Sequence, residues 1–317
     1  MPTFVGSAPD AADIPTPNPP GPPDPPIPPP LGGGTTYYLA TTGNDSDPGG
    51  VLDPFLTLGH FWSIAGPGDN LRVRGGTFSG AAARNMDLHN TYGDPSGTSG
   101  APITVTNYTD EVPIFDGGAN GSTNSDRYWL LANGPSSFIT INGIKLINYN
   151  MNQNGIITVT GGSSTASGWI LSNLDSQQVG GGTCDATNQN IYWGANVQGA
   201  LVDTCILRGP YPTTPTTGAG VGTDHYPAAQ DVTVRDCTFI NCHKGTQIYG
   251  SPGGSPSGVT IAILDNVYTN CGRNIELVWY QQALVTGNTG TIASESPTYN
   301  LYDSGNGVLT ASNNTWT

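Results

Sequence analysis

Apolar and polar residues alternate in short segments along most of the chain, and clusters of turn-forming residues separate these segments. A period of two predicts strands rather than helices, beginning with Tyr37 to Ala40 and Leu71 to Val73. Between these two strands the spacing changes, because apolar groups at positions 58, 61, 62 and 65 fit one face of a helix. The pattern therefore predicts a short amphipathic helix over Leu56 to Ala65 inside an otherwise all-β chain.

The segments recur. The sequence Asp236-Cys-Thr-Phe-Ile-Asn-Cys242 returns as Asp265-Asn-Val-Tyr-Thr-Asn-Cys271, and Gly143 to Tyr149 fits the same template. Repeats of this length indicate a solenoid, and their period-two interior indicates coils made of strands. In such a coil, equivalent residues of neighbouring turns stack about 4.8 Å apart.

The repeat register predicts which residues stack. We expect one column through Asn173, Cys205, Cys237, Asn266, Asn288 and Asn313, and a second through Asn148, Asn241 and Asn270. Cys205 with Cys237, and Cys242 with Cys271, should be neighbours with reduced sulfurs, because buried thiols behave as small hydrophobes. No pair of the five cysteines has zinc-site spacing, and we expect no metal.

Residues 37 to 78 resemble the N-terminal cap of the pectate-lyase-like superfamily of right-handed parallel β-helix proteins. The likeness rests on the strand at Tyr37-Tyr38, the turn Gly43-Asn-Asp-Ser46, the helix beginning at Pro54-Phe55, and the run Pro67-Gly-Asp to Phe78. It implies an all-β, right-handed parallel β-helix over residues 35–317, with a short capping helix at its N-terminal end. One fold hosts many functions, so the likeness does not specify an activity.

An extended proline-rich arm precedes this body, over residues 1–34. Eleven of the sixteen residues from Pro15 to Pro30 are proline, and three glycines then form a hinge. Such a stretch favours polyproline II and would span roughly 50 Å. This stretch is interpreted either as a passive spacer or as an attachment arm. In the second case the large apolar groups for docking are Phe4, Val5 and Ile14.

The net charge and the apolar content of the chain exclude some classes of binding partner. The chain of 317 residues has a formal net charge of −14, with 9 Lys plus Arg against 23 Asp plus Glu. This charge disfavours nucleic acid as a partner, and no apolar run is long enough for insertion into a membrane. The first residues lack the basic and apolar regions of a Sec signal, which favours synthesis in a reducing cytoplasm.

One basic pair stands out. Lys244 follows Cys242 by two positions and Arg273 follows Cys271 by two, so the register places them on adjacent coils; Lys145 is the only other lysine in the chain. Some polysaccharide lyases of this fold resemble this arrangement, with a Lys base beside an Arg and Ca²⁺ neutralising the uronate. Under that alternative Lys244 and Arg273 are catalytic, and Glu276, Asp224 and Asp265 supply carboxylates. The bland alternative is two solvated turn residues.

Aromatic and polar residues near turns are candidates for glycan binding, because ring faces stack on sugars while polar groups take the hydroxyls. The candidates are Tyr192, Trp193, Tyr211, Asp224, His225, Tyr226, Tyr249, Trp279 and Tyr280. Some of these rings are expected to fill the core instead. The motifs of polygalacturonase-type hydrolases are absent, so Asp224-His225 alone does not indicate hydrolysis.

Three functions remain open. The first is a spike or fibre of a phage or phage-like particle: a trimer on the virion surface that binds cell-surface polysaccharide and attaches to other virion proteins through residues 1–34, without a cofactor. The second is a Ca²⁺-assisted polysaccharide lyase acting on a uronate polymer. The third is a surface adhesin or filament subunit.

Overall fold

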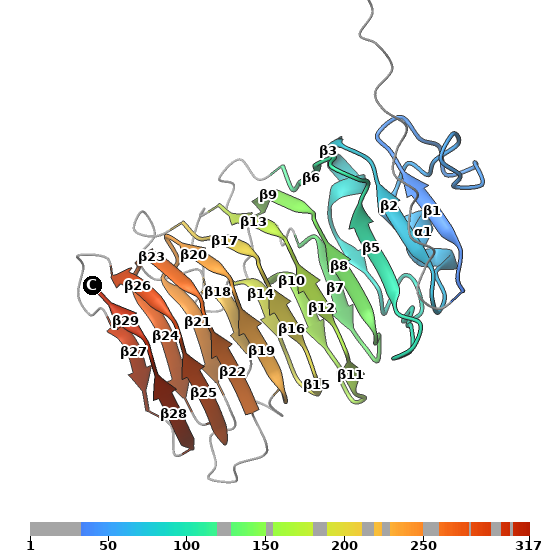
Figure 1. The fold of residues 1–317 in the computed structure, drawn as a ribbon. Helices are drawn as coiled ribbons and strands as arrows, with labels where there is room; N and C mark the ends of the chain where they lie inside the picture. The colour runs from blue at the N-terminus through green and yellow to red at the C-terminus, as the bar shows by residue number, and fades with distance from the viewer. Residues whose placement is uncertain are drawn as a thin grey trace, which may run out of the picture.

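The computed structural model describes residues 33–118, 128–149, 155–179, 189–210, 219–223, 229–249, 260–278, 280–292, 299–304 and 307–317. These residues wind through three parallel sheets into one elongated solenoid of about eight turns, with its N-terminal coil and its last coil at opposite ends (Figure 1). The predicted right-handed parallel β-helix is confirmed. The arm and its docking residues Phe4, Val5 and Ile14 lie outside the described residues.

Each complete coil contributes one strand to each sheet in the order A, B, C, and the two terminal coils lack one or more of these strands. Sheet A has ten strands: β1 Thr36–Leu39, β2 Asn70–Val73, β5 Ile103–Asn107, β8 Ile139–Asn142, β12 Ile170–Ser172, β16 Leu201–Asp203, β19 Val232–Arg235, β22 Thr260–Leu264, β25 Gln282–Thr286 and β28 Val308–Ser312. Sheet B has nine: β3 Gly76–Phe78, β6 Pro113–Asp116, β9 Lys145–Tyr149, β13 Asp175–Gln178, β17 Ile206–Arg208, β20 Thr238–Ile240, β23 Val267–Cys271, β26 Thr289–Ile292 and β29 Thr315–Trp316.

Sheet C closes each coil with eight strands: β4 Met86–Asp87, β7 Leu130–Asn133, β10 Gly155–Thr160, β14 Gln189–Trp193, β18 Ala219–Thr223, β21 Lys244–Tyr249, β24 Arg273–Val278 and β27 Tyr299–Asp303. A small pair, β11 Ala166–Ser167 with β15 Val197–Gln198, lies beside two of the coils, and a 3-10 turn covers Gly80–Ala83. All these sheet pairings are parallel, as stacking of successive coils requires.

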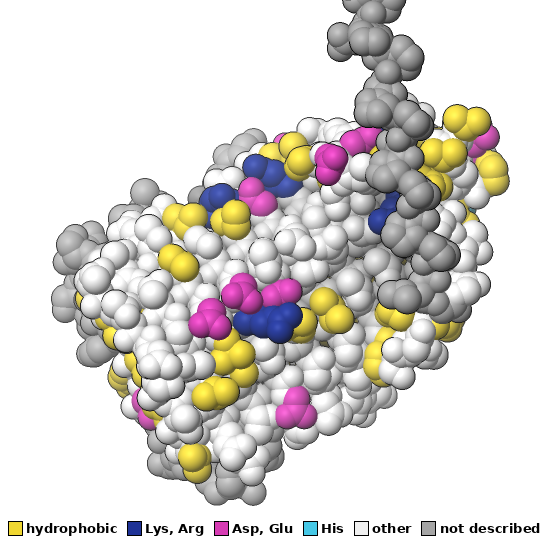
Figure 2. Space-filling view, in the orientation of Figure 1, with side chains coloured by type: hydrophobic (Ala, Val, Ile, Leu, Met, Phe, Trp, Pro, Cys, Tyr) yellow, Lys and Arg dark blue, Asp and Glu magenta, His cyan; other side chains and the backbone are white. Residues whose placement is uncertain are grey.

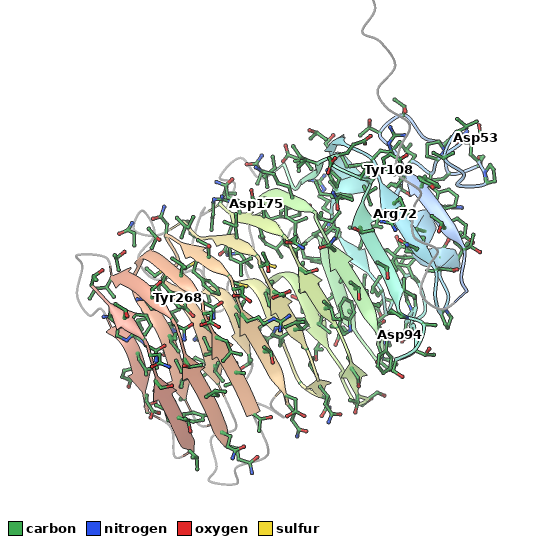
Figure 3. The ribbon with its side chains drawn as sticks, viewed as in Figure 1. Asp53, Arg72, Asp94, Tyr108, Asp175 and Tyr268 are labelled. Atoms are coloured by element: carbon green, nitrogen blue, oxygen red, sulfur yellow. The ribbon has the colours of Figure 1, made fainter. Side chains whose placement is uncertain are left out.

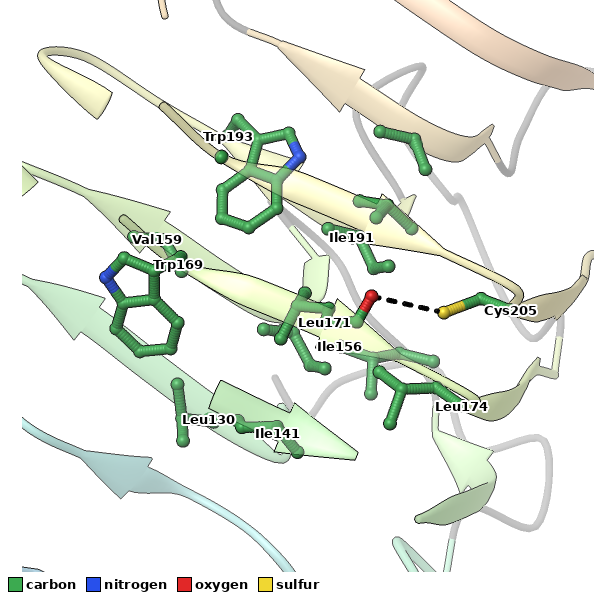
Figure 4. Close-up of a cluster of buried hydrophobic side chains, with 14 of the residues drawn as sticks. Leu130, Ile141, Ile156, Val159, Trp169, Leu171, Leu174, Ile191, Trp193 and Cys205 are labelled. Atoms are coloured by element: carbon green, nitrogen blue, oxygen red, sulfur yellow. Dashed lines mark hydrogen bonds between the residues drawn. The ribbon is translucent and has the colours of Figure 1, made fainter. Parts of the chain in front are cut away.

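The core runs along the solenoid axis because alternate residues of every strand point inward. Val202, Val234, Ile263 and Val285 form one such row, paired from coil to coil and fully buried. Large rings fill the wider places, including Trp169 and the inward Tyr268 (Figures 3 and 4). The same alternation read from the sequence is therefore what buries this core.

The predicted cap helix is present as α1, Leu58–Ile64, and it begins two residues later than expected. Thr57 is its N-cap, with its hydroxyl accepting from the His60 N–H, and Asp45 accepts the N–H groups of Leu56 and Thr57. Because Asp45 holds these two residues in the turn before the helix, they do not enter it. The helix buries Leu58, Phe61 and Trp62 against the first coil. In the part of the chain that the structure describes, no helix has the length and apolar character to cross a membrane.

The turn between sheets A and B fixes the first stacked column, and it corrects two members of the prediction. Asn173 and Asn313 adopt left-handed backbone with φ of 51° and 55°, and the inward positions follow them at Leu174 and Asn314. The column continues without change elsewhere: the Cys205 N–H meets Cys237 Sγ at 3.4 Å and the Cys237 N–H donates to Asn266 Oδ1 at 2.9 Å. Asn266 and Asn288 donate in turn to Asn288 and Asn314.

The cysteine register is confirmed, and the second column is confirmed for the contact between Asn241 and Asn270. Asn241 and Asn270 are joined by a hydrogen bond of 2.8 Å, whereas Asn148 donates to Asp116 of the preceding coil instead. The four described cysteines are buried and free, as predicted: Cys205, Cys237, Cys242 and Cys271. Cys205 also donates to the Leu171 carbonyl of the coil before it (Figure 4). A hydrogen bond with Cys205, together with burial, raises the pKa of the Cys237 thiol, so this thiol stays protonated.

Candidate functional site

Lys244 and Arg273 lie side by side on sheet C, as the repeat register predicts. They are paired across β21 and β24, each at the first position of its strand. Lys244 is almost fully buried, with 9% of its side chain exposed, and Arg273 is partly buried, with 23% exposed. Neither is a solvated turn residue, so the bland alternative is wrong for Lys244.

Glu276 joins the two cations. Its Oε2 atom accepts from Arg273 Nη1 at 2.8 Å and lies 3.2 Å from Lys244 Nζ, while Oε1 accepts from the Tyr249 hydroxyl at 2.8 Å. The carboxylate has only 3% of its side chain exposed. Burying charges is costly unless they are paired and hydrogen-bonded, and this group meets both conditions. The three charges leave one net positive charge on a face of a strongly acidic protein.

The surroundings fix the protonation states. Burial alone would raise the pKa of the Glu276 carboxyl, but the charge of Lys244 and the hydrogen bonds from Arg273 and Tyr249 outweigh it and lower the pKa. Burial lowers the pKa of Lys244 against the opposing effect of Glu276. Burial and the hydrogen bond to Glu276 raise the pKa of Tyr249 to about 12, so this phenol keeps its proton near neutral pH.

His243 lies directly before Lys244 and is neutral at pH 7. Burial lowers its pKa to about 4, and the positive charges of Lys244 and Arg273 act in the same direction. Aromatic rings complete the cluster, since Lys244 Nζ lies 5.5 Å from the ring centre of Tyr249, and the Arg273 guanidinium lies 5.4 Å from that of Tyr302. These distances permit cation–π attraction.

A row of polar and aromatic positions crosses sheet C from coil to coil. The register aligns Tyr192, Gly222, Gln247, Glu276 and Tyr302 on five successive strands. The side-chain amide of Gln189 lies over Gly222, where a Cβ atom would come within 2.1 Å of Oε1 of Gln189. The sequence-based reasoning did not find either glutamine. The repeat could have indicated Gln247, because Gln247 follows Cys242 by five residues just as Glu276 follows Cys271 by five.

The connections also differ around the coil. From β8 onward, two residues separate each sheet A strand from the following sheet B strand. Several sheet C strands are joined to their neighbours by longer segments, with ten residues between β17 and β18 and ten between β21 and β22, whereas a single residue separates β23 from β24. Binding groups in solenoids collect where insertions are tolerated, so sheet C is the side that favours function.

The structure separates the other glycan-binding candidates. Trp193 and Tyr280 belong to the buried hydrophobic cluster, so neither offers a ring face to a ligand. Tyr249 lies partly exposed on the sheet C face, whereas Tyr192 on β14 is buried, with 9% exposed. The remaining candidates Tyr211, Asp224, His225, Tyr226 and Trp279 lie outside the described residues.

The described residues do not fit a Ca²⁺ site at this cluster. Both oxygens of Glu276 already accept hydrogen bonds or contact a cation. Asp265 belongs to the turn between β22 and β23, with φ of 54°, and so lies on the A–B side of the coil. Within the described part of the chain no three His, Cys, Asp or Glu side chains form a group that could hold a metal ion.

Charged side chains are sparse elsewhere on the surface, as the face in Figure 2 shows. On sheet B, Asp175 contacts both Lys145 and Arg208 (Figure 3). A groove of about 450 Å³ crosses the outer side of sheet A, and its lining includes Thr233, Thr260 and Leu284. Of the described residues that line this groove, Asp231 alone is charged, so the groove is a largely uncharged surface distinct from the cluster on sheet C.

Comparison with known proteins bears on the fold. No family model matches the chain. The uncharacterized protein YwoF of Bacillus subtilis strain 168 is 33% identical over 86 residues, which are 27% of this chain and 16% of that protein. The chain therefore matches only a small part of that relative's length.

Two solved structures share the architecture. The pectate lyase Pel9A superposes with a TM-score of 0.50 at 13% identity, covering 88% of this chain and 78% of that chain. XylC in complex with xylose gives a TM-score of 0.53 at 12% identity, covering 81% and 68%. The fold is thus the pectate-lyase-like right-handed parallel β-helix that the N-terminal resemblance implied.

Proposed function

We propose that this protein binds carbohydrate on the outer face of sheet C, around Glu276. The observation that carries the proposal is the cluster itself: two cations, a carboxylate and a tyrosine brought together from β21 and β24 and nearly withdrawn from solvent. Structures of this fold include a pectate lyase and a protein determined with xylose, which supports a sugar as the ligand.

The face suits a sugar chain for physical reasons. Tyr249 and Tyr302 supply rings for the apolar faces of pyranoses, and the glutamines and charged groups supply directional hydrogen bonds. Recognition groups repeat with the coil, at about 4.8 Å. A ligand with a regular repeat can use successive coils in the same way.

We also propose the setting: a spike or fibre on a phage or phage-like particle, with the coil presented to cell-surface polysaccharide. The proline-rich arm supports this proposal, because residues 15–30 would hold the body away from whatever residues 1–14 bind. The body would act as a homotrimer on the particle surface. If the protein is instead a surface adhesin or filament subunit, it would bind polysaccharide with the same sheet C face and would not belong to a particle.

A polysaccharide lyase is the second candidate, favoured by the contact of Lys244 and Arg273 with one carboxylate. In that reaction the uncharged Lys244 amine would remove the proton at carbon 5 of a uronate. The electron pair would form the double bond to carbon 4 as the bond from carbon 4 to its oxygen breaks, and Tyr249 could protonate the leaving oxygen. Glu276 holds Lys244 in its charged form, so the cluster in this state favours binding over chemistry.

A polysaccharide array tests binding and cleavage together. Wild-type protein should bind at least one immobilised glycan, and Arg273→Gln should weaken that binding by roughly tenfold or more, because hydrogen bonds to charged groups contribute about 1.5–3 kcal/mol. Gln177→Ala on the exposed face of sheet B is the matched control. Absence of any glycan binding would overturn the proposal. A rise in ultraviolet absorbance with a uronate polymer would establish the lyase in its place.

The particle setting needs a separate experiment. Deleting residues 2–33 should leave the melting temperature of the coil nearly unchanged, since each coil contacts only its neighbours. The shortened protein should no longer be found on assembled particles. Normal incorporation of the shortened protein would show that the arm is not the attachment.

A further inference from the structure

Among the residues that the structure describes, two buried glutamine amide oxygens on sheet C have no hydrogen-bond partner. These are Oε1 of Gln189 and Oε1 of Gln247, and the two residues are only 3% and 5% exposed. A buried polar atom without a partner costs about 1–3 kcal/mol, and native structures rarely keep one without a reason. Two of them on one face, beside the Glu276 cluster, call for a common explanation.

The two amides lie at neighbouring positions of the same row. Gln189 belongs to β14, but its amide crosses to the next coil and occupies the space over Gly222. Gly222 is paired with Gln247 on β21. Adjacent strands of a sheet are about 4.8 Å apart, so the Gln189 amide and the Gln247 side chain occupy adjacent sites along the solenoid axis.

Gly222 is what makes this arrangement fit. A Cβ atom there would lie 2.1 Å from Oε1, 2.3 Å from Cδ and 2.3 Å from Nε2 of Gln189. Such distances do not occur between nonbonded atoms, so any larger residue would displace the amide from the row. Glycine thus positions a side chain of another coil here, and backbone conformation is not its reason.

The orientation of Gln247 is set by the cluster. Tyr249 receives a hydrogen bond from the Gln247 side chain and donates its own to Glu276. One N–H of the Gln247 amide is therefore used by Tyr249, and the amide oxygen is the acceptor without a partner among the described residues. Both unpartnered atoms are acceptors, so the ligand that completes them carries hydrogen-bond donors.

We propose that Gln189 and Gln247, with Gly222 between them, form a subsite for an uncharged pyranose unit that donates hydroxyl or acetamido hydrogens to the two amide oxygens. This inference rests on the proposed glycan binding and adds the chemistry of one unit. The subsite lies next to Glu276 in the same row, so the units bound there and at the charged cluster are neighbours in the ligand. Its specificity is for donors without charge, in contrast to the adjoining ion-paired position.

Calorimetric titration of the full-length protein tests the subsite with three probes: cellohexaose, chitohexaose and hexagalacturonate. We expect Gln189→Ala and Gln247→Ala each to weaken binding of an uncharged probe by roughly 5- to 10-fold, the effect of one lost neutral hydrogen bond. Gly222→Ala should cause a similar loss by displacing Gln189. Gln177→Ala, an exposed glutamine of sheet B, should leave the affinity unchanged.

The outcomes separate the two proposals. If no probe and no glycan of the array binds wild-type protein, the proposed function itself fails. If a glycan binds and Arg273→Gln weakens it while Gln189→Ala and Gln247→Ala do not, the subsite is wrong and the amides hold water only. Equal losses for hexagalacturonate and the uncharged probes would overturn the preference for an uncharged unit. Thermal melting of each variant identifies losses that come from unfolding, and Gln189→Ala retains the test if Gly222→Ala does not fold.

Discussion

The A–B turn and sheet C both stack side chains from coil to coil, but they stack different kinds of residues. In the A–B turn, the last three inward positions carry the same residue, and Asn266, Asn288 and Asn314 hydrogen-bond to one another and to the backbone. On sheet C, the stacked residues differ from coil to coil, as with Gly222, Gln247 and Glu276. Charges there pair across coils, and two glutamine amide oxygens have no partner within the described part of the chain.

This difference shows how a solenoid separates stability from function. A column of like side chains satisfies itself and leaves nothing for a ligand. A column of unlike side chains leaves hydrogen-bonding groups available, and it depends on specific neighbours to offset its charges. Removing one residue should therefore have different consequences on the two sides.

The largest expected effect comes from removing the shared carboxylate. Glu276→Ala leaves Lys244 and Arg273 close together without their counter-charge, and breaking a buried ion pair costs about 3–5 kcal/mol. Chemical denaturation at pH 7 measures the loss. Glu111→Ala is the matched control, because Glu111 pairs with Arg74 in a site where both side chains are about a third exposed, at 33% and 37%. That change should cost about 1 kcal/mol or less for the ion pair. Equal losses for the two variants would contradict the importance of burial.

A somewhat smaller loss is expected on the turn side. Asn266→Ala removes the acceptor for the Cys237 N–H and the donors to Val234 O and Asn288 Oδ1. Leaving these buried groups unpaired should cost about 2–3 kcal/mol. Thr269→Ala on the exposed face of β23 should change the free energy of unfolding by less than about 0.5 kcal/mol. If Asn266→Ala were equally mild, the column would not contribute to stability as described.

Lowering the pH should reduce the free energy of unfolding through His243, which directly precedes strand β21 of sheet C. Its pKa is about 4 in the folded protein against an ordinary value of 6.5, so the unfolded chain binds the extra proton first as the pH falls. The stability contribution is fully present above about pH 6.5 and is lost between that value and pH 4. His243→Gln should reduce the difference in unfolding free energy between pH 7 and pH 4.5 by about 1–2 kcal/mol. An unchanged pH profile would show that the imidazole titrates normally.

The smallest effect is a gain on the turn side. Thr204 holds a left-handed backbone with φ of 54°, which is unfavourable for a β-branched residue, and its side chain is exposed. Thr204→Gly should raise the free energy of unfolding by about 1 kcal/mol. Asn173→Gly at the equivalent turn should change it less, because asparagine tolerates this conformation. A loss of stability for Thr204→Gly would mean that the side chain contributes more than the backbone strain removes.

Much of the fold could be predicted because it depends on periodicity. The alternation of apolar residues specifies the strands, the repeat from Asp236 to Asp265 specifies the coil, and the spacing at positions 58, 61 and 62 specifies the cap helix. The stacking of Cys205 on Cys237 and of Lys244 beside Arg273 follows from the same register. These features require only the distance along the chain.

Other features depend on which way a side chain points and on what lies beside it. The shift of the turn column from Asn313 to Asn314 follows from the left-handed residue in the turn, which changes the residue that faces inward. Trp193 entered the core because the strand alternation at β14 places it in the hydrophobic cluster.

The sequence by itself determined the solenoid, its cap, its free cysteines and the adjacency of the two cations. Only the tertiary structure decided that Glu276 bridges them and that Gln189 crosses to the space over Gly222. The physical reason is that a repeat fixes the spacing of backbone positions. The contacts between unlike side chains depend on their lengths and directions, which no periodicity encodes.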